Sequence, residues 1–418
     1  MSGSADYSTP VVILQSGHHG GLGIARSLGR LGAPVYVVGS SPWEPAFVSR
    51  YCRGHFHLDE DSAVEDLARI GRKIGGRPIL IPTTDDATLW LAGNAAALSA
   101  VFRFPAQDAA LVQTLCDKGW MSELARASGV PTPQSMVPRS KDDIVRFADS
   151  AAFPVVVKET GGGRLRCRTG GTKFVVQTPG ELAELYAKAE DPERPRMIVQ
   201  EFVPGEDWMF NGYFDGNSRC LLGITGKKIR RFPVDTGVTS LGICVANETV
   251  IRSTTEFMRA IGYRGILDIG YRCDQRDGQY KVLDVNPRIG CTFRLFASQN
   301  GLDVARALYL DLTGQPVSAA PFPQGRKWIV EDFDFFSAFR SWRAGKLSLK
   351  DWIRSLAGIQ EAACFAADDP LPFFLMPLAD CCELMRWTRS RAAARKSPHL
   401  EIDSMPLQEH MPLQEQRR

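Results

Sequence analysis

The sequence lacks a marked excess of charge of either sign. Its 50 basic and 47 acidic residues among 418 leave a formal net charge of +3, so no strong field would attract nucleic acid or a membrane surface. Residues 1–9 are polar and contain no basic segment followed by an apolar run, so they do not predict a secretory signal. We therefore expect a cytoplasmic protein that acts on small molecules and binds neither nucleic acid nor membrane.

Long apolar runs and paired cysteines are also missing. The most apolar late segment, residues 371–379, contains two prolines and is much shorter than the roughly 20 residues that span a bilayer. The ten cysteines form no CxxC pair and have no histidine nearby at metal-ligand spacing. These absences argue against a membrane span and a zinc site, and favour free thiols in a reducing compartment.

What is present is enough apolar sequence, 44% of the residues, for several hydrophobic cores. Residues 1–115 alternate strand and helix patterns. Strands are predicted at 11–14, 35–38 and 78–82, and helices at 24–31 and 85–98. This order is typical of an open parallel α/β domain with helices outside the sheet.

Glycines at 17, 20, 21 and 23 follow the first predicted strand. Their spacing departs from the GxGxxG dinucleotide fingerprint, and no acidic residue closes the second strand. Two interpretations remain, nicotinamide binding or a tight strand-to-helix turn with at most a substrate or phosphate contact. The second is favoured.

Residues 116–315 predict an α+β domain. A helix from 117 to 128 should end at Gly129, since Pro131 and Pro133 follow. Short strands rich in Val, Ile and Phe begin at Phe153. Beyond this domain, the aromatic residues of 316–390 are spaced like packing helices and predict a small, mostly helical C-terminal element. The polar segment 391–418 is expected to be a disordered tail.

Two strands of a predicted hairpin each carry an aspartate within an apolar run. Asp268 lies in the first strand and Asp284 in the second, with Asn286 on the same strand face two residues further on. A carboxylate among apolar neighbours needs a counter-charge, which a magnesium ion would supply. The alternative is a pair of buried salt bridges with nearby arginines, among them Arg264, Arg272 and Arg288.

Two lysines lie in contrasting contexts. Lys158 ends a buried-strand run and precedes glycines 161–163, a setting suited to phosphate oxygens. Lys118, near the start of its helix, reads by itself as an ordinary surface lysine. Residues 197–207 predict a strand followed by a turn, which could pair with a purine edge or be no more than a common turn.

In their order along residues 10–315, these features resemble the ATP-grasp superfamily. The resemblance implies an open α/β domain before a two-lobed ATP-grasp fold, with a hinge near residues 200–207. It also implies ATP as cofactor with one or two Mg²⁺ ions, Mn²⁺ being an alternative. Position 284 is aspartate where the superfamily usually has glutamate, so one ion is better supported than two.

The resemblance assigns roles to individual positions. Phosphate contacts fall on Lys118, Lys158 and a cover loop that contains Gly161, Gly162 and Gly163. Adenine contacts fall on Gln200 and the backbone of Glu201 and Val203, and the ribose contact on Asp207. The metal ligands are Asp268, Asp284 and Asn286, and Arg288 is the arginine of the Asn-Pro-Arg motif.

Residues 226–233, Gly-Lys-Lys-Ile-Arg-Arg-Phe-Pro, resemble the Lys-Ile-Arg-x-Pro run of the carboxylate-amine ligase branch. This likeness places Lys228 at phosphate and either Arg230 or Arg231 at the acceptor carboxylate. A solvated basic face is the alternative. Many grasp-fold enzymes are dimers, so a homodimer is expected from the resemblance alone.

The function implied is an ATP-dependent ligase that activates a small carboxylate as an acyl phosphate and couples it to an amine. Arg288 would stabilise the charge that develops during both steps. Two alternatives remain open. One is a kinase that phosphorylates a small molecule, and the other is a regulatory protein that binds ATP without catalysis.

Overall fold

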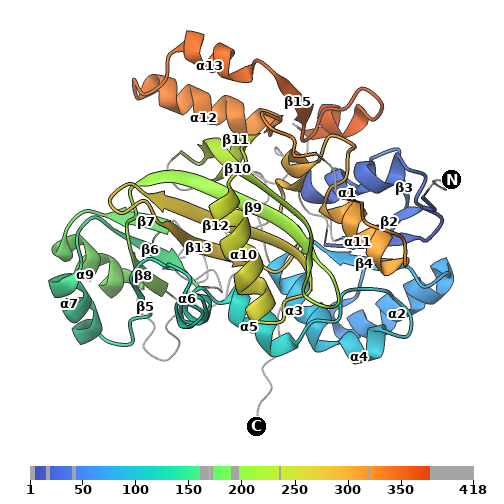
Figure 1. The fold of residues 1–418 in the computed structure, drawn as a ribbon, viewed down its shortest axis with the longest axis horizontal. Coiled ribbons are helices and arrows are strands. Elements are labelled where there is room, and N and C mark those ends of the chain that lie inside the picture. The colour runs from blue at the N-terminus through green and yellow to red at the C-terminus, as the bar shows by residue number, and fades with distance from the viewer. Residues whose placement is uncertain are drawn as a thin grey trace, which may run out of the picture.

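A computed structural model describes residues 5–15, 19–39, 44–160, 169, 173–189, 197–234, 237–318 and 321–376. Within these residues the chain forms an N-terminal α/β domain, a two-lobed central region and a C-terminal extension (Figure 1). The predicted tail and the predicted cover-loop glycines lie outside the described residues. None of the helices in the described part of the chain is long and apolar enough to cross a bilayer.

The N-terminal domain is built on a parallel sheet, as predicted. Its strand order is β3-β2-β1-β4, and β1 is buried at every position because helices cover both faces. The strands are β1 (Val11–Leu14), β2 (Val35–Val38), β3 (Cys52–Phe56) and β4 (Ile79–Pro82). The helices are α1 (His19–Gly29), η1 (Glu60–Ser62), α2 (Ala63–Ile74), α3 (Asp85–Gly93) and α4 (Ala95–Leu98).

The described part of the glycine-rich segment, from His19 onward, is helical rather than a turn. Helix α1 begins at His19, so Gly20, Gly21 and Gly23 lie in its first turns, and the prediction of a helix starting at residue 24 was wrong. Close packing explains the glycine at position 23. A Cβ atom at Gly23 would lie 2.9 Å from the ring of Phe293, so the helix and that ring could not approach as they do.

The smaller lobe of the central region is an antiparallel sheet with order β5-β8-β6-β7. Helices α7 and α9 pack on one side of it (Figure 1). Its elements are β5 (Ser135–Met136), α7 (Lys141–Ser150), β6 (Val155–Glu159), β7 (Lys173–Val176), α9 (Pro179–Ala189) and β8 (Met197–Glu201). Helices α5 (Ala109–Cys116) and α6 (Lys118–Ala127) connect this lobe to the N-terminal domain.

The larger lobe is a curved sheet with order β13-β12-β9-β10-β11-β14-β15 (Figure 1). One face packs on the N-terminal domain and α11, and the other on α6 and α10. Its elements before the extension are β9 (Gly205–Phe214), β10 (Cys220–Phe232), β11 (Val238–Cys244), α10 (Glu248–Ala260), β12 (Gly265–Asp274), β13 (Tyr280–Asn286), η2 (Phe293–Phe296) and α11 (Val304–Leu312). The predicted aspartate hairpin is the antiparallel pair β12–β13.

The C-terminal extension is mostly helical, but it also completes the large sheet. Helices α12 (Glu331–Arg343) and α13 (Leu349–Leu356) are flanked by β14 (Lys327–Ile329) and β15 (Ile359–Ala362). Strand β14 pairs antiparallel with β11, and β15 pairs parallel with β14. Both strands were missed because they are too short to show a periodic pattern.

Candidate active site

A row of polar side chains crosses three neighbouring strands of the large sheet. Asp268 on β12 lies directly opposite Asn286 on β13 and Asn211 on β9. Directly opposite residues of antiparallel strands project from the same face, so the three side chains share one face of the sheet. Asn286 Nδ2 lies 3.5 Å from Asp268 Oδ2. The aspartate that the sequence singled out is therefore flanked by an amide on each side.

Asp284 joins this row from the same strand as Asn286. It lies opposite Gly270, which has no side chain to fill the space above the sheet. Burial raises the pKa of Asp268 above its ordinary value, Arg288 and Lys228 oppose that shift, and the negative charge of Asp284 adds to it. Asp268 is thus a desolvated carboxylate that also lies in the field of Asp284.

The backbone around Asp268 is shaped to leave its carboxylate room. A Cβ atom at Gly290 would overlap Asp268 Oδ2, so a larger residue there would displace the carboxylate. Asn211 is fully buried, and neither polar atom of its side chain makes a hydrogen bond within the described part of the chain. It still lies close enough to Asp268 to favour the charged carboxylate.

This donor set fits a hard cation. Carboxylate and amide oxygens are the ligands that Mg²⁺ takes, and a cation would compensate both the desolvated carboxylates and the amide of Asn211. Among the described residues, no three His, Cys, Asp or Glu side chains gather in a metal-binding group. A cation bound here would therefore rely on amide oxygens as well as on the two carboxylates.

The smaller lobe faces this row with lysines. Lys158 lies at the end of β6, opposite Lys173 at the start of β7, and its Nζ donates to Gln200 Oε1 at 2.7 Å. Burial, together with the charge of Lys173, lowers the pKa of Lys158 to about 7. Burial and the charges of Arg231 and Lys228 lower the pKa of Lys173 to about 8. An anion between these groups would relieve both effects.

Lys118 is placed by the start of α6. The side chain of Asp117 caps that helix by accepting hydrogen bonds from the backbone N–H groups of Gly119 and Trp120. Lys118 is then the first helical residue, and its Nζ donates to the carbonyl oxygen of Glu159 at 3.2 Å. The positive charge of Lys118 contributes to the low pKa of Lys158, so the structure brings together the two lysines that the sequence predicted.

The hinge segment makes contacts that differ in part from those expected. Gln200 is held by Lys158, as stated above. The backbone N–H of Glu201 donates to the carbonyl oxygen of Gln134 at 2.8 Å, and the Glu201 carboxylate pairs with Arg276. Val203 is buried between β8 and β9. Its adenine contact, and that of Glu201, stay predictions.

Asp207 lies between two arginines. Its carboxylate pairs with Arg231 at 2.5 Å and with Arg272 at 3.5 Å, so in this structure its oxygens face cations and the ribose contact stays a prediction. Lys228 is half-buried nearby, and desolvation lowers its pKa although the charge of Asp207 acts in the opposite direction.

Arg230 and Arg231, which the sequence left as alternatives, have different partners in the structure. Arg231 joins Asp207 in the site, as described. Arg230 instead forms a two-bonded ion pair with the buried carboxylate of Asp334 on α12, at 2.8 Å for each bond, and also donates to Ser355. Arg230 therefore faces the C-terminal extension and away from Asp207.

Arg288 connects the site to the N-terminal domain. Its Nε donates to Asp85 Oδ1 at 2.7 Å, and its Nη2 lies 3.5 Å from Asn286 Oδ1. Burial alone would lower the pKa of Arg288, but Asp85 raises it above its ordinary value. The guanidinium group therefore stays charged beside the predicted metal ligands.

Three residues of this site were missed from the sequence. Asn211 is a polar residue inside the apolar run of β9, which is itself a signal. Lys173 starts the strand that follows the glycine-rich segment, as Lys158 ends the strand before it. Asp85 follows the carboxyl end of the parallel strand β4, a common position for binding residues.

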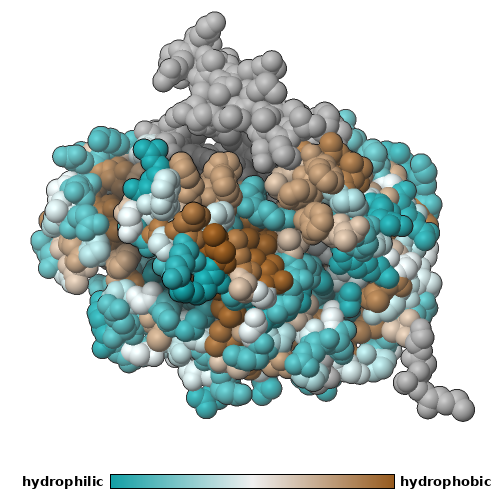
Figure 2. Space-filling view, turned by 90° about the horizontal axis from the view of Figure 1, so that it is seen from above, coloured by the Kyte–Doolittle hydropathy of each residue, from teal (hydrophilic) through white to brown (hydrophobic). Residues whose placement is uncertain are grey.

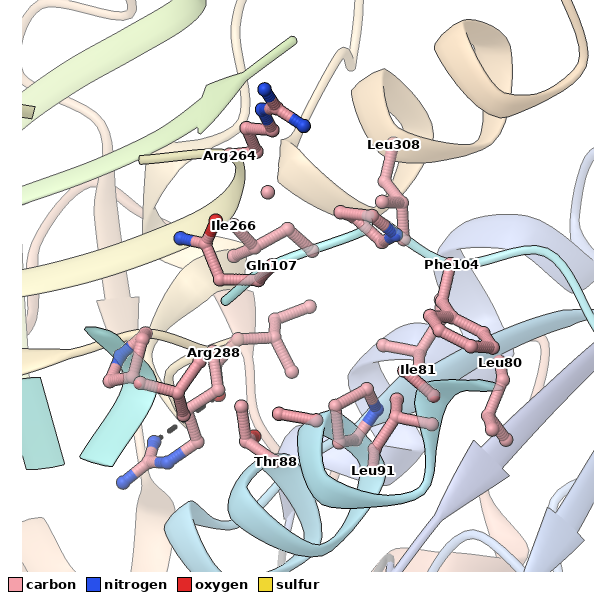
Figure 3. A pocket seen from close by; sticks show the side chains of 18 of the residues that line it. Leu80, Ile81, Thr88, Leu91, Phe104, Gln107, Arg264, Ile266, Arg288 and Leu308 are labelled. Carbon is pink, nitrogen blue, oxygen red and sulfur yellow. Dashed lines mark hydrogen bonds between the residues drawn. The ribbon is translucent and has the colours of Figure 1, made fainter. Parts of the chain in front are cut away.

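A cavity of about 70 Å³ lies beside Arg288, between the N-terminal domain and the start of β12. Apolar side chains of Ile81, Leu91, Phe104 and Ile266 surround it, and the guanidinium group of Arg288 points away from it (Figure 3). The cavity has room for a small apolar group and contains no cluster of charges.

No model of a known protein family matches the sequence. Similarity to solved structures identifies the fold. The N5-carboxyaminoimidazole synthetase of Staphylococcus aureus, solved with ADP, superimposes with a TM-score of 0.60 at 15% identity, over 76% of this chain and 80% of that one. This chain has the ATP-grasp fold. An L-amino acid ligase from Bacillus licheniformis shares the ATP-grasp fold with a TM-score of 0.55 at 18% identity, over 74% of this chain and 75% of that one.

Curated relatives agree with the ATP-grasp assignment over shorter stretches. The chain is 26% identical over 221 residues to a D-aspartate ligase of Enterococcus faecium, which is 50% of this chain and 52% of the relative. It is 26% identical over 212 residues to the large chain of a carbamoyl phosphate synthase of Thermus thermophilus, which is 48% of this chain and 20% of that one. The chain thus spans about half or less of the length of these relatives.

Proposed function

We propose that this protein is an ATP-dependent ligase that activates a small carboxylate as an acyl phosphate and couples it to an amine. The observation that carries the proposal is the meeting of two sets of groups. Lysines of the smaller lobe face a row of carboxylates and amides on the larger lobe. Together with Lys118 on α6, these lysines outnumber the two carboxylates, Asp268 and Asp284. An excess of positive charge suits a nucleoside triphosphate and its metal ion.

The chain's own residues account for the first step. Lys118, Lys158 and Lys173 bind phosphate oxygens, and the last two gain full charge as they do so, because burial lowers their pKa values in the free protein. Asp268, Asp284 and Asn286 hold Mg²⁺, with Asn211 as a further oxygen beside them. When bound, the ion neutralises charge on the phosphate oxygens.

The second step needs an anchored carboxylate and a shielded acyl phosphate. Arg231, paired with Asp207 at the edge of the site, is the better placed of the two candidate arginines for the acceptor carboxylate. Arg288 faces the metal ligands and stabilises the negative oxygen that forms when the amine attacks the acyl carbon. Arg230 keeps its partner Asp334 and has no part in either step.

Amino acids are the first substrates to screen. Two of the similar proteins are called a D-aspartate ligase and an L-amino acid ligase, and an amino acid supplies both a carboxylate and an amine. The site's arginines suit a small carboxylate, whereas the cavity beside Arg288 is lined mainly by apolar side chains.

The test measures ADP release and trapping of the acyl phosphate by hydroxylamine, with acids and amines added singly and in pairs. A ligase yields a hydroxamate with the correct acid and forms amide only when both substrates are present. Transfer of the γ-phosphoryl group to a hydroxyl acceptor, with release of ADP and without hydroxamate, would indicate a kinase. ATP binding without ADP release across the whole screen would indicate a non-catalytic ATP-binding protein.

A further inference from the structure

Helix α12 packs Phe333 and its small and polar residues against the protein, and it turns its other four large aromatic residues to solvent. Asp334, Ser337 and Ala338 are buried against the large sheet. The outward-facing aromatic residues are between 46% and 56% exposed: Phe335, Phe336, Phe339 and Trp342. An ordinary surface helix turns its apolar stripe to the core, whereas four of the five large aromatic residues of α12 are exposed.

Helix α13 extends the same feature. It has no buried residue, and Leu349 and Ile353, one turn apart, are each 59% exposed. The two helices lie side by side at the top of the molecule (Figure 1), and the rings of Phe335 and Trp352 are in contact. Seen from that side, apolar side chains gather into a patch bordered by hydrophilic ones (Figure 2). We call residues 335–356 the outer helical face.

Basic residues accompany the aromatic ones on the outer helical face. Five exposed basic side chains occur there: Arg340, Arg343, Lys346, Lys350 and Arg354. Asp351 is the one acidic residue in 335–356, and it is already paired with Arg354 at 3.1 Å. A chain with a net charge of only +3 therefore concentrates positive charge on one apolar surface.

The exposed aromatics belong to a firmly attached element and not to a frayed one. Arg230 bonds Asp334 from the adjoining strand, and Ser337 Oγ donates to the carbonyl oxygen of Arg231. Trp352 Nε1 donates to Asp334 Oδ2 at 3.0 Å, which joins α13 to α12. The exposed surface is therefore presented in a defined orientation.

We propose that the outer helical face docks onto anionic membrane surfaces. Aromatic and aliphatic side chains beside Lys and Arg are the composition of helices that lie in the membrane interface, where Trp is enriched. Each basic residue near such a surface adds attraction to anionic headgroups. The small net charge of the whole chain predicted no membrane binding, but the outer helical face has a local excess of positive charge.

A second copy of the chain fits this face less well. A two-fold contact would bring the same patch of each protomer together, and the two positively charged patches would repel each other. An anionic lipid surface compensates those charges. The helical pair also projects from the body of the molecule (Figure 1), which suits a broad, flat partner.

Vesicle co-sedimentation of the full chain tests the proposal. Phosphatidylcholine vesicles are compared with vesicles that also contain phosphatidylglycerol. The parent chain should sediment with the anionic vesicles, and the Phe339→Ser, Trp342→Ser pair should weaken that partitioning about tenfold or more. Val145→Ser on α7, as exposed as Trp342 at 56%, is the matched control and should bind like the parent.

The charge component is tested separately. Replacing Arg343, Lys346 and Lys350 by Gln should lower partitioning to anionic vesicles about a hundredfold and leave binding to neutral vesicles unchanged. Replacing Arg72 and Lys73 by Gln on α2 is the control. Circular dichroism melting of each variant establishes that it is folded, which is expected because these side chains are exposed.

Two outcomes would overturn the proposal. One is a parent chain that does not sediment with anionic vesicles. The other is binding that the aromatic and charge variants leave intact. Analytical ultracentrifugation tests whether a second copy of the chain covers this face instead. A parent chain that is dimeric and does not bind vesicles, and whose dimer the Phe339→Ser, Trp342→Ser pair dissociates, would assign the face to a second copy.

Discussion

Asn211 combines full burial with two polar atoms that find no hydrogen-bond partner among the described residues, a costly state for an amide. It lies opposite Asp268 on the neighbouring strand, whose carboxylate is itself desolvated. At the scale of single residues, these two features indicate a ligand-binding site. A bound cation would compensate both the Asn211 amide and the Asp268 carboxylate.

Asn211→Ala should weaken metal binding without destabilising the fold. The amide makes no hydrogen bond of good geometry within the described part of the chain, and its contact with Asp268 serves the proposed cation site, so the free energy of unfolding should change by less than about 1 kcal/mol. The Mg²⁺ concentration needed for half-maximal ADP formation should rise about 10- to 100-fold. Mg²⁺ titration and urea unfolding measure the two quantities, and a large loss of stability with unchanged Mg²⁺ dependence would show that Asn211 is only structural.

Asp284→Asn should lower ADP formation about 100-fold or more while the protein stays folded, because a neutral amide cannot replace a carboxylate facing a divalent ion. Asp277→Asn, in the exposed turn of the same hairpin, is the control. Turnover is followed by coupled ADP detection. Normal turnover in Asp284→Asn would contradict the metal assignment.

Nucleotide binding should be coupled to proton uptake through Lys158. Its pKa of about 7 in the free protein leaves it mostly neutral at pH 8, and phosphate oxygens favour the charged form, so binding raises that pKa and takes up a proton. Affinity for ATP should therefore fall as pH rises above about 7. Calorimetry in buffers of different ionisation enthalpy measures the uptake at pH 8.

Lys158→Met is the variant for that experiment, with Lys73→Met on the outer side of α2 as control. The methionine variant should bind ATP more weakly and lose its share of the proton uptake. Equal uptake in the parent and in Lys158→Met would place the titrating group elsewhere, Lys173 being the nearest candidate.

At the scale of elements, strand β10 shows how neighbouring residues acquire different roles. Its pairing with β11 is irregular between Lys228 and Arg231, and such irregularities redirect side chains along a strand. Arg231 pairs with Asp207 at the site, whereas Arg230 pairs with Asp334 on α12. Neighbouring residues of one strand thus contact the candidate site and the C-terminal extension.

Arg230→Met should destabilise the protein by about 3–5 kcal/mol, because it leaves the carboxylate of Asp334 buried without its counter-charge. The Michaelis constants should stay near those of the parent. Arg231→Met should show the opposite pattern, with raised Michaelis constants and a smaller loss of stability. Denaturant unfolding and steady-state kinetics compare the two variants.

Arg354→Met is the matched control, since its ion pair with Asp351 is exposed and contributes little. An Arg230→Met variant that is as stable as the parent but needs far more acceptor would return Arg230 to the acceptor site.

At the scale of the whole molecule, the site exists only where two separate sheets face each other. Lysines come from β6, β7 and α6, and the carboxylates and amides come from β9, β12 and β13. Arg288 adds a contact to α3 of the N-terminal domain. A ligand that bridges these parts should therefore stabilise the entire central region.

ATP with Mg²⁺ should raise the unfolding temperature more than ATP with a chelator. A ligand present at about 100 times its dissociation constant stabilises the native state by about 2.7 kcal/mol. Differential scanning fluorimetry measures the shift, and Asp268→Asn should lose the part that depends on Mg²⁺. Equal shifts with and without the metal ion in the parent would contradict the proposed cation site.

Much of the architecture was determined by local sequence. Valine-rich runs predicted the central parallel strand and β6, and Gly129 followed by prolines predicted the end of α6. The hairpin of Asp268 and Asp284 was also predicted, because alternating apolar residues around a turn specify antiparallel strands locally. The ATP-grasp fold followed from the order of these features and is confirmed by the structural likeness.

The tertiary structure alone decided which side chains meet. Asn211 is far from Asp268 in the sequence and lies opposite it only because β9 and β12 pair. Arg230 and Arg231 are equivalent as sequence, and only the irregular pairing of β10 and the position of Asp334 separate them. Periodicity reports which residues are buried, but partners across a sheet or between lobes depend on register and packing, which no local pattern contains.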